Sequence, residues 1–420
     1  MESESHRGDH QRVVVTGLGA FTPVGHSAAE TWQALKEGRS GVGPLTLLEG
    51  EWACQVAGEL KGFDPGRYLP HNKLRHMAQA SQLAVITAEE ALRDSGLDLD
   101  QEDRDRIGVV LGTAGGSTIE ETEQAAAAMH GEEPKKISPF RVVRLWPNMA
   151  SYFVAAAHRL RGYNSTICTA CASGTQAIGE AAAVIRRGEA EIVITGGTES
   201  VVSRAAFAGF SAMRALATSF NAEPERAMRP FDARREGFVA AQGSATLILE
   251  SLAHAVKRGA RIYAEVLGLG VSNDSFHMIE PEPQGEGAAL AVRRALASAG
   301  IGPDRVDYIN AHGTSTPLGD AAETRAIKAV FGERAYDIPV SSTKSMLGHM
   351  MGAAGAVEAL ACIMTIVERV IHPTINYETP DPECDLDYVP NAARSAEVRV
   401  AVSNSFGLGG QNAVLVLGAV

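Results

Sequence analysis

Short apolar segments alternate with amphipathic segments along most of the chain. Apolar runs that contain β-branched residues and border on glycine predict buried β-strands. These runs are 12–16 (RVVVT), 106–111, 191–195, 245–250, 261–267, 306–310, 338–342, 398–402 and 413–417. Apolar residues at helical spacing predict helices at 77–95, 172–187, 251–258, 286–299, 319–331 and 353–369. Strands that alternate with helices indicate an α/β fold with a mostly parallel sheet covered on both faces.

Two parts of the chain share one local feature. Each reaches a junction of small residues between a turn and a helix, Cys171-Ala-Ser-Gly in the first and Gly352-Ala-Ala-Gly-Ala in the second. This faint repeat fits two similar α/β units packed together as one structural unit. We expect the halves to be 12–260 and 261–420, after a loose polar tail at 1–11.

Composition narrows the class of protein. The chain has 420 residues, of which 45% are hydrophobic and 21% charged, as in a folded globular protein. The formal net charge of −12 argues against nucleic acid as a partner and requires a local basic patch for any acidic partner. Five cysteines, an odd and sparse set, argue for a reducing compartment. We see no signal peptide and no apolar run near the roughly 20 residues that cross a bilayer. We therefore expect a cytoplasmic protein without membrane contact.

The stretch CTACASG at 168–174 carries two thiols three positions apart, and it leaves three alternatives open: a redox pair, half of a zinc site, or one nucleophile. Cys171 begins the helix predicted at 172–187, where backbone N–H groups and the helix dipole favour a thiolate and lower the thiol pKa. Cys168 ends an apolar stretch, so we expect a buried, inert thiol. Zinc would need two further ligands, and the remaining cysteines are isolated, at Cys54, Cys362 and Cys384.

Further segments favour the nucleophile. NAHGTSTP places His312 just after a predicted strand, where the sites of α/β proteins gather. STKSMLGHMMGAAG places Lys344 and His349 in a glycine-punctuated loop before a helix, and SNSFGLGGQN at 403–412 forms a glycine-rich turn. A cysteine at a helix N-terminus together with two loop histidines and a lysine is a rare combination.

Four motifs in this order, CTACASG, NAHGTSTPLGD, STKSMLGHMMGAAGAVE and NSFGLGGQN, resemble the condensing enzymes of fatty-acid synthesis. Within that family the chain is most similar to the type II β-ketoacyl-acyl-carrier-protein synthases, over nearly its whole length. The resemblance implies the thiolase fold, a duplicated α/β unit in a five-layer αβαβα sandwich. It also implies a homodimer, an acyl carrier protein as partner, and no required cofactor.

The resemblance also implies roles for individual residues. Cys171 would hold the acyl chain as a thioester, and His312 and His349 would donate hydrogen bonds to the malonyl thioester carbonyl. Lys344 would orient the site, with Glu358 as its partner. Backbone N–H groups of Cys171 and Leu408 would form the oxyanion hole. Residues expected along the substrate channel are Ala114, Phe231, His277, Thr314, Thr316, Phe406 and Leu408. Residues that match a structural monovalent cation site of some relatives are Asn310, Glu358, Ser403 and Asn404.

The chain departs from the family pattern at three positions. Leu408 replaces a gating aromatic, Gln411 replaces a threonine, and Ala114 replaces a bulky aliphatic residue. These changes indicate a roomier acyl pocket, or drift with compensation elsewhere. For carrier docking, the resemblance points to basic residues around the channel mouth: Lys73, Arg75, Lys135, Lys136, Arg141, Arg144 and Arg214.

Four alternatives remain open at this point. A thiolase would carry a second catalytic cysteine near its C-terminus, which NSFGLGGQN lacks. A type II polyketide ketosynthase shares the Cys-His-His set and differs in the acyl pocket. A non-catalytic partner subunit of the chain-length-factor kind would lack the nucleophile, and Cys171 is present. A redox protein would depend equally on Cys168 and Cys171, whereas a synthase depends on Cys171 alone.

Overall fold

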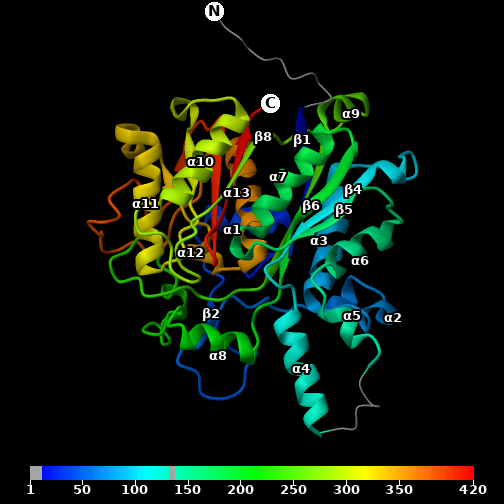
Figure 1. Ribbon diagram of the computed structural model, residues 1–420, viewed down its shortest axis with the longest axis horizontal. Helices are drawn as coiled ribbons and strands as arrows, with labels where there is room; N and C mark the ends of the chain where they lie inside the picture. The colour runs from blue at the N-terminus through cyan, green and yellow to red at the C-terminus, as the bar shows by residue number, and fades with distance from the viewer. Residues whose placement is uncertain (1–11, 132–137) are drawn as a thin grey trace, which may run out of the picture.

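A ten-stranded sheet runs through the molecule in this computed structural model, which describes residues 12–131 and 138–420 (Figure 1). Its strands are β1 Val13–Phe21, β4 Ile107–Gly112, β5 Asn164–Ile167, β6 Ile192–Glu199, β7 Gly243–Ser251, β8 Ala264–Asn273, β9 Tyr308–Asn310, β10 Val340–Ser341, β13 Val400–Gly407 and β14 Gln411–Gly418. The strand order is β10-β9-β13-β14-β8-β1-β7-β6-β4-β5. Two small sheets pair β2 Gly43–Pro44 with β3 Val56–Ala57, and β11 Val370–Ile371 with β12 Arg394–Ser395. The expected tail at 1–11 lies outside the described residues.

The sheet is mixed, so the prediction of a mostly parallel sheet was wrong. The outer strands pair in parallel, β4 with β5 and β6, and β9 with β10 and β13. The central strands β7, β1, β8 and β14 pair antiparallel. The tight turn between β13 and β14 shows the reason. Gly409 and Gly410 adopt positive φ there, at 85° and 75°, and the connection is too short for the crossover that a parallel pair requires.

The strand order confirms the predicted duplication. From the centre outward, one half is β1-β7-β6-β4-β5 and the other is β8-β14-β13-β9-β10. In each half the first two pairings are antiparallel and the last two parallel. The halves join where Val14 pairs with Glu265 and Val15 with Ala264. The boundary at residue 260 stays a prediction.

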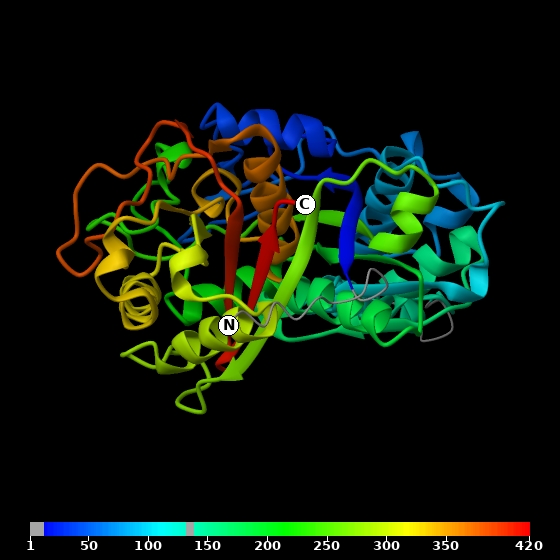
Figure 2. The ribbon, with the colours of Figure 1, turned by 90° about the horizontal axis from the view of Figure 1, so that it is seen from above.

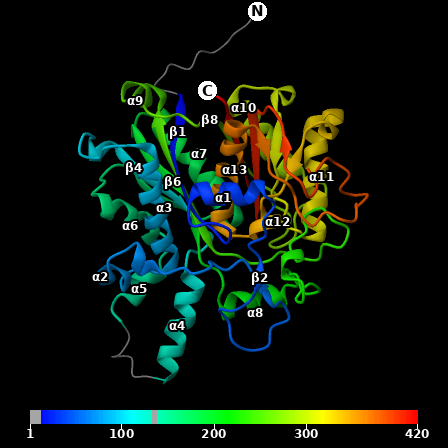
Figure 3. The same ribbon diagram turned by 180° about the vertical axis from the view of Figure 1, so that it is seen from behind.

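Helices cover both faces of each half. They are α1 Ala28–Lys36, α2 His71–Leu74, α3 Gln79–Ser95, α4 Thr118–Gly131, α5 Arg141–Leu145, α6 Met149–His158, α7 Ser173–Arg186, α8 Arg204–Ala212, α9 Leu252–Lys257, α10 Glu286–Ala299, α11 Pro317–Phe331, α12 Lys344–Leu347 and α13 Ala354–Glu368. Helices α7 and α13 contact each other and strands of both halves, so they form a central layer (Figures 2 and 3). Helix α3 covers the outer face of one half and α10 that of the other.

Successive side chains of a strand point to opposite faces of the sheet, so each face packs against a different layer of helices. In β4, Val109 and Leu111 pack in the outer core beneath α3 and α6, whereas Val110 packs against the central layer. In β7, Ile248 faces outward while Leu247 and Leu249 face the centre. Outer helix, sheet, central helices, sheet and outer helix make the five layers of the expected fold.

The central position of α13 explains its composition. Among the described residues, Met351–Glu368 is the one helical stretch long and apolar enough to cross a membrane, with a mean hydropathy of 1.6. The expectation that no apolar run approaches 20 residues was therefore wrong for this segment. Because 83% of it is buried inside the fold, its apolar surface contacts other protein layers.

The two predicted junctions of small residues begin the central helices. Cys171 lies in a 3₁₀ turn, Ala170–Ala172, before α7, and Gly352 lies in the matching turn Met351–Ala353 before α13. The residue before each, Ala170 or Met351, has a left-handed φ of 49° or 45°. The equivalent geometry shows that Gly352 is the internal counterpart of the Cys171 position.

A side chain at Gly352 should destabilise the fold. A Cβ atom there would lie 2.2 Å from the backbone nitrogen of Ala114, so Gly352→Ala forces the turn apart. We expect a loss of about 1–3 kcal/mol in the free energy of unfolding, measured by urea denaturation. The matched control is Gly209→Ala in α8, where nothing lies within 4 Å of the new Cβ. It should stabilise the protein by about 0.5–1 kcal/mol through its helix propensity. Equal stability of the two variants would contradict this account.

Candidate active site

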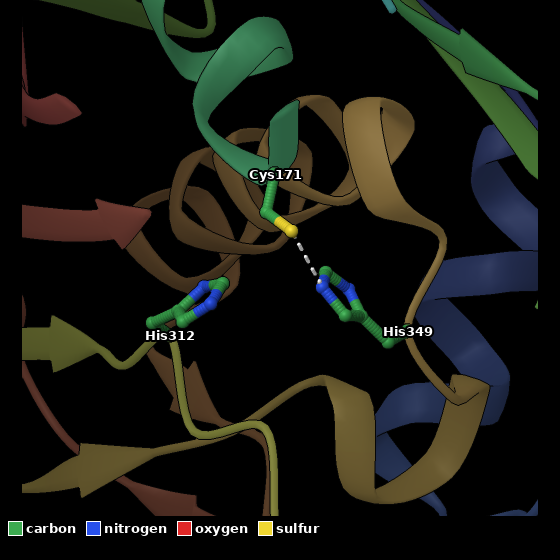
Figure 4. Close-up of side chains that lie close together, drawn as sticks. All are labelled: Cys171, His312 and His349. Carbon is green, nitrogen blue, oxygen red and sulfur yellow. Dashed lines mark hydrogen bonds between the residues drawn. The ribbon is translucent and has the colours of Figure 1, made fainter. Parts of the chain in front are cut away.

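Cys171 lies at the centre of a buried group of three side chains (Figure 4). Its Sγ is 3.0 Å from His349 Nε2, and the rings of His349 and His312 lie edge to face with centroids 5.5 Å apart. One sulfur and two ring nitrogens lie within 4.8 Å of one another. The structure therefore brings together the cysteine and both histidines that the sequence predicted.

Backbone pairing holds His349 in place. Its N–H donates to the carbonyl of Val239 at 2.7 Å, and its own carbonyl accepts from Ala241 N–H at 3.0 Å. The ring packs edge to face on Phe238, with centroids 5.5 Å apart. Burial, followed by the charge of Lys344, holds the pKa of His349 well below its usual range. His349 is therefore neutral at neutral pH.

Lys344 determines which nitrogen of His312 carries the proton. The lysine Nζ lies 3.3 Å from His312 Nδ1 and 2.6 Å from the His312 carbonyl oxygen, and it forms an ion pair with Glu358. An ammonium only donates, so Nδ1 accepts and Nε2 carries the hydrogen. Burial, then Lys344 and His349, hold the pKa of His312 well below its usual range. His312 is thus a neutral Nε2–H donor.

A carboxylate fixes the loop after β9. Glu323 on α11 accepts from the backbone N–H groups of His312 and Gly313, both at 2.8 Å. Gly313 has a φ of 37°, and a Cβ there would lie 2.7 Å from Ser342. Sequence reasoning missed Glu323. The sequence feature that could have identified Glu323 is its position in the helix that directly follows the NAHGTSTP loop, one turn after Asp320.

The Cys171 thiol does not have the lowered pKa that we expected. Burial raises its pKa to about 11, while Lys344 and the backbone N–H of Leu408 act in the opposite direction. Cys171 is only 6% exposed and packs in an apolar cluster with Phe207 and Met351. The cost of desolvating the thiolate is larger than the stabilisation that the thiolate gains from the helix N-terminus, so the pKa rises. The resting site therefore holds a thiol that donates to the neutral His349 Nε2.

Cys168 corrects a second expectation, because it is exposed rather than buried. Its Sγ donates to the Ala114 carbonyl at 3.2 Å, and burial of part of the group raises its pKa. Cys168 follows the edge strand β5, so one side of its segment has no neighbouring strand among the described residues. All five cysteines of the chain are free.

A cavity of about 400 Å³ leads to the three side chains. Its walls include many predicted residues: Cys171, Arg214, His312, Thr314, Thr316, His349, Phe406 and Leu408. Thr314 and Thr316 share a hydrogen bond of 3.0 Å between their hydroxyl groups. Sequence reasoning missed the wall residues Met213, Phe238, Asp274, Ile279 and Glu280, which come from segments without a local motif. It also missed Leu318, which lies within the NAHGTSTPLGD motif but was given no role.

Three predicted channel residues do not line this cavity. Phe231 is fully buried and stacks on Tyr388, with ring centroids 3.9 Å apart. Its ring also packs against the backbone of Gly313. His277 is exposed, and its Nδ1 accepts from the backbone N–H groups of Ile279 and Glu280, so it shapes the loop instead. Ala114 packs in the apolar cluster of Cys171.

Glu199 joins the turn after β4 to the junction at Gly352. This carboxylate is 3% exposed and accepts from the backbone N–H groups of Ala114 at 2.7 Å and Gly352 at 3.1 Å. Burial, opposed by these hydrogen bonds, raises its pKa to about 7. It therefore fixes the wall behind Cys171. No sequence motif pointed to it.

The predicted docking residues differ in their surroundings. Arg214 is exposed, lines the cavity and has no ion pair among the described residues. Lys73 and Arg75 are exposed at α2. Arg141 and Arg144 both pair with the buried carboxylate of Glu121, whose single negative charge offsets only one of their two positive charges. Lys135 and Lys136 lie outside the described residues.

Comparison with known proteins decides the family. Residues 10–255 match the family "Beta-ketoacyl synthase, N-terminal domain", and residues 263–378 match "Beta-ketoacyl synthase, C-terminal domain". The chain is 46% identical over 414 residues to 3-oxoacyl-(acyl-carrier-protein) synthase 2 of Coxiella burnetii, covering 98% of this chain and 99% of that relative. It is 46% identical to the Synechocystis sp. protein of the same name, covering 97% and 98%. The chain belongs to the β-ketoacyl synthase family.

Solved structures agree with this assignment. A β-ketoacyl synthase from Burkholderia phymatum superposes with a TM-score of 0.90 and 37% identity, covering 97% of this chain and 99% of that chain. A chain of the AntDE:AntF complex, a type II PKS acyl-carrier protein with its ketosynthase, superposes with a TM-score of 0.89 and 35% identity, again covering 97% and 99%. The predicted family and thiolase-like α/β fold are confirmed.

The charges around Cys171 predict opposite effects of two substitutions on its reactivity. Lys344→Met removes a positive charge, raises the thiol pKa and should slow alkylation by iodoacetamide about threefold to tenfold at each pH between 7 and 10. Glu358→Gln removes a negative charge, lowers the pKa and should accelerate alkylation.

The rate is followed by intact mass in a Cys168→Ala background, since Cys168 is the exposed thiol. If both variants shifted the rate in the same direction, loosened packing rather than charge would be the cause.

Proposed function

We propose that this protein is a 3-oxoacyl-(acyl-carrier-protein) synthase that condenses an acyl chain on Cys171 with a malonyl group. The contact that supports this most directly is the 3.0 Å hydrogen bond between the buried Cys171 thiol and His349 Nε2. It provides a nucleophile and a proton acceptor that both line the cavity of about 400 Å³.

Acyl transfer uses Cys171 and His349. As Sγ attacks the thioester carbonyl, its proton passes to His349 Nε2 and then to the departing pantetheine sulfur. One C–S bond forms and one breaks. The developing oxyanion accepts hydrogen bonds from the backbone N–H groups of Cys171 and Leu408; the Leu408 N–H already acts to lower the pKa of the Cys171 thiol. Because His349 Nδ1 has no hydrogen-bond partner among the described residues, no bond ties the ring to one tautomer.

Condensation uses both histidines. The malonyl group loses carbon dioxide, and the electron pair of the broken C–C bond moves into an enolate. His312 donates through Nε2–H, the tautomer that Lys344 enforces, and His349 donates in its Nε2–H form. The carbanion then attacks the acyl-Cys171 carbonyl, forms the new C–C bond and releases the cysteine sulfur. Preorganised donors of this kind typically contribute about a hundredfold to a thousandfold each.

A fatty-acid role is better supported than a polyketide role. The relatives named 3-oxoacyl-(acyl-carrier-protein) synthase 2 are 46% identical to this chain. The ishigamide ketosynthase/chain length factor structure is 38% identical, and the AntDE:AntF chain 35%. The free, buried Cys171 thiol argues against a non-catalytic subunit, and the separation of an exposed Cys168 from a buried Cys171 gives no support to a redox pair.

We further propose a homodimer formed along β5. This strand ends the ten-stranded sheet, and an edge strand with unpaired backbone groups is suited to pairing with a second copy. Beside it, Trp146 is 55% exposed and Tyr152 on α6 is 52% exposed. We place the protein in the cytoplasm, which its free cysteines support.

The chemistry requires no cofactor, but the residues fit a structural monovalent cation. Each of the four predicted residues has one buried oxygen without a hydrogen-bond partner in the described part of the chain: Asn310 Oδ1, Glu358 Oε2, Ser403 Oγ and Asn404 Oδ1. Asn310 and Ser403 are direct partners between β9 and β13, and α13 packs on β13. Unsatisfied buried oxygens are costly, and a cation would satisfy them. Such an ion would support Glu358, the partner of Lys344.

Intact mass tests the nucleophile. Wild type incubated with acyl-carrier thioesters of graded chain length should gain one acyl group, and so should Cys168→Ala, whereas Cys171→Ala should gain none. Adduct formation with long acyl chains would support the roomier pocket proposed from Leu408 and Ala114. If adducts formed only with the chain lengths that relatives with bulkier residues use, the substitutions would instead be sequence drift with compensation elsewhere. Absence of any adduct on wild type would overturn the synthase proposal.

Steady-state kinetics test carrier docking at Arg214. Carrier proteins are acidic, so Arg214→Glu should raise the KM for acyl-carrier substrate about fivefold to tenfold with little change in kcat. The control Lys257→Glu changes the same charge on α9, at the opposite end of the molecule from α8 (Figure 1), and should leave KM unchanged. If small thioester mimics lost as much as carrier substrates, Arg214 would act within the channel and not in docking.

A further inference from the structure

A fully buried histidine, His372, lies beside the proposed cation site, and the sequence pointed to no role for it. Its Nδ1 is 3.1 Å from the carbonyl oxygen of Pro373. A carbonyl only accepts, so Nδ1 carries the proton and Nε2 is left as an acceptor.

Donors surround Nε2 of His372. Thr343 Oγ1 lies at 2.9 Å, Asn310 Nδ2 at 3.1 Å and Tyr308 Oη at 3.2 Å. The amide nitrogen of Asn310 also bonds Thr343 Oγ1 at 2.8 Å and Tyr308 Oη at 3.1 Å. All of these side chains are buried.

This arrangement fixes the orientation of the Asn310 amide. If the amide were flipped, Oδ1 would face the lone pair of His372 Nε2, and two acceptors would meet in a buried site. With Nδ2 towards His372, Oδ1 faces the other side, where it has no hydrogen-bond partner among the described residues. There it is next to β13, which carries the unsatisfied oxygens of Ser403 and Asn404.

We propose that His372 is a positioning residue that turns Asn310 Oδ1 towards a monovalent cation held with Glu358, Ser403 and Asn404. This inference rests on the cation site proposed above and adds the group that orients one of its ligands. Partners behind a metal ligand typically affect affinity about tenfold to a hundredfold when they are removed.

Thermal unfolding tests the inference with a readout that does not depend on activity. The midpoint is measured against KCl or NaCl at constant ionic strength, with tetramethylammonium chloride as the balancing salt. A site ligand raises the midpoint by mass action, so the wild-type midpoint should rise with the logarithm of the cation concentration once that concentration exceeds Kd. His372→Leu should raise the Kd obtained from this dependence at least about tenfold. His372→Gln, which retains an acceptor, should stay within about twofold. In an Asn310→Leu background, His372→Leu should cause no further change in ion dependence.

The outcomes separate the proposals. A wild-type midpoint that does not respond to K⁺ or Na⁺ would overturn the cation site, and the role of His372 with it. A response that is the same in wild type and His372→Leu would keep the site and overturn the positioning role. Acylation of Cys171, measured by mass, tests the synthase proposal independently of both.

Anomalous scattering from wild-type crystals soaked in rubidium chloride provides a second measurement, which needs no folded variant. We expect the ion within bonding distance of Asn310 Oδ1, with Nδ2 on the His372 side. An ion that contacts other oxygens but not Asn310, or density that requires the flipped amide, would overturn the inference.

Discussion

The buried contact of Lys344 with Glu358 and His312 is the interaction on which the site depends. An ion pair with both partners about 1% exposed gains little net stability, because removing two charges from water costs as much as their attraction returns. The ion pair instead determines the orientation and the protonation of the groups around it. The ammonium can only donate, so it holds the His312 carbonyl, selects the Nε2–H tautomer and opposes protonation of both histidines. Burial and this one charge together keep two imidazoles neutral beside a thiol.

The duplicated fold explains why these groups meet. Cys171 lies in the turn before α7 of one half, whereas His312, Lys344 and His349 belong to the other half. The two central helices α7 and α13 contact each other between the sheets. The junctions are equivalent, but Gly352 occupies the position that Cys171 has in its own half. The backbone of Thr113 and Ala114, in the turn after β4, lies so close to Gly352 that a glycine is required there, and a second nucleophile at that position is sterically excluded.

Burial sets the electrostatics of the whole site. It raises the pKa of the Cys171 thiol to about 11, raises that of Glu199 to about 7 and lowers that of His372 to about 4. Neutral forms are favoured in each case, since desolvation penalises charge. The nucleophile is therefore generated during attack, by transfer of its proton to His349, rather than stored as a thiolate.

The sequence by itself determined the local elements and the chemistry-bearing residues. The helix predicted at 286–299 is α10, the helix predicted at 77–95 is α3 with Gly96 as its left-handed cap, and Cys171, His312, Lys344 and His349 were identified from their motifs. Periodicity and turn residues are local, so one sequence reveals them. Tertiary structure alone decided strand direction, the exposure of Cys168, the raised pKa of Cys171 and the supporting roles of Glu199, Glu323 and His372. These depend on contacts between segments far apart in the chain, and no local pattern encodes the desolvation or the donor geometry that such contacts create.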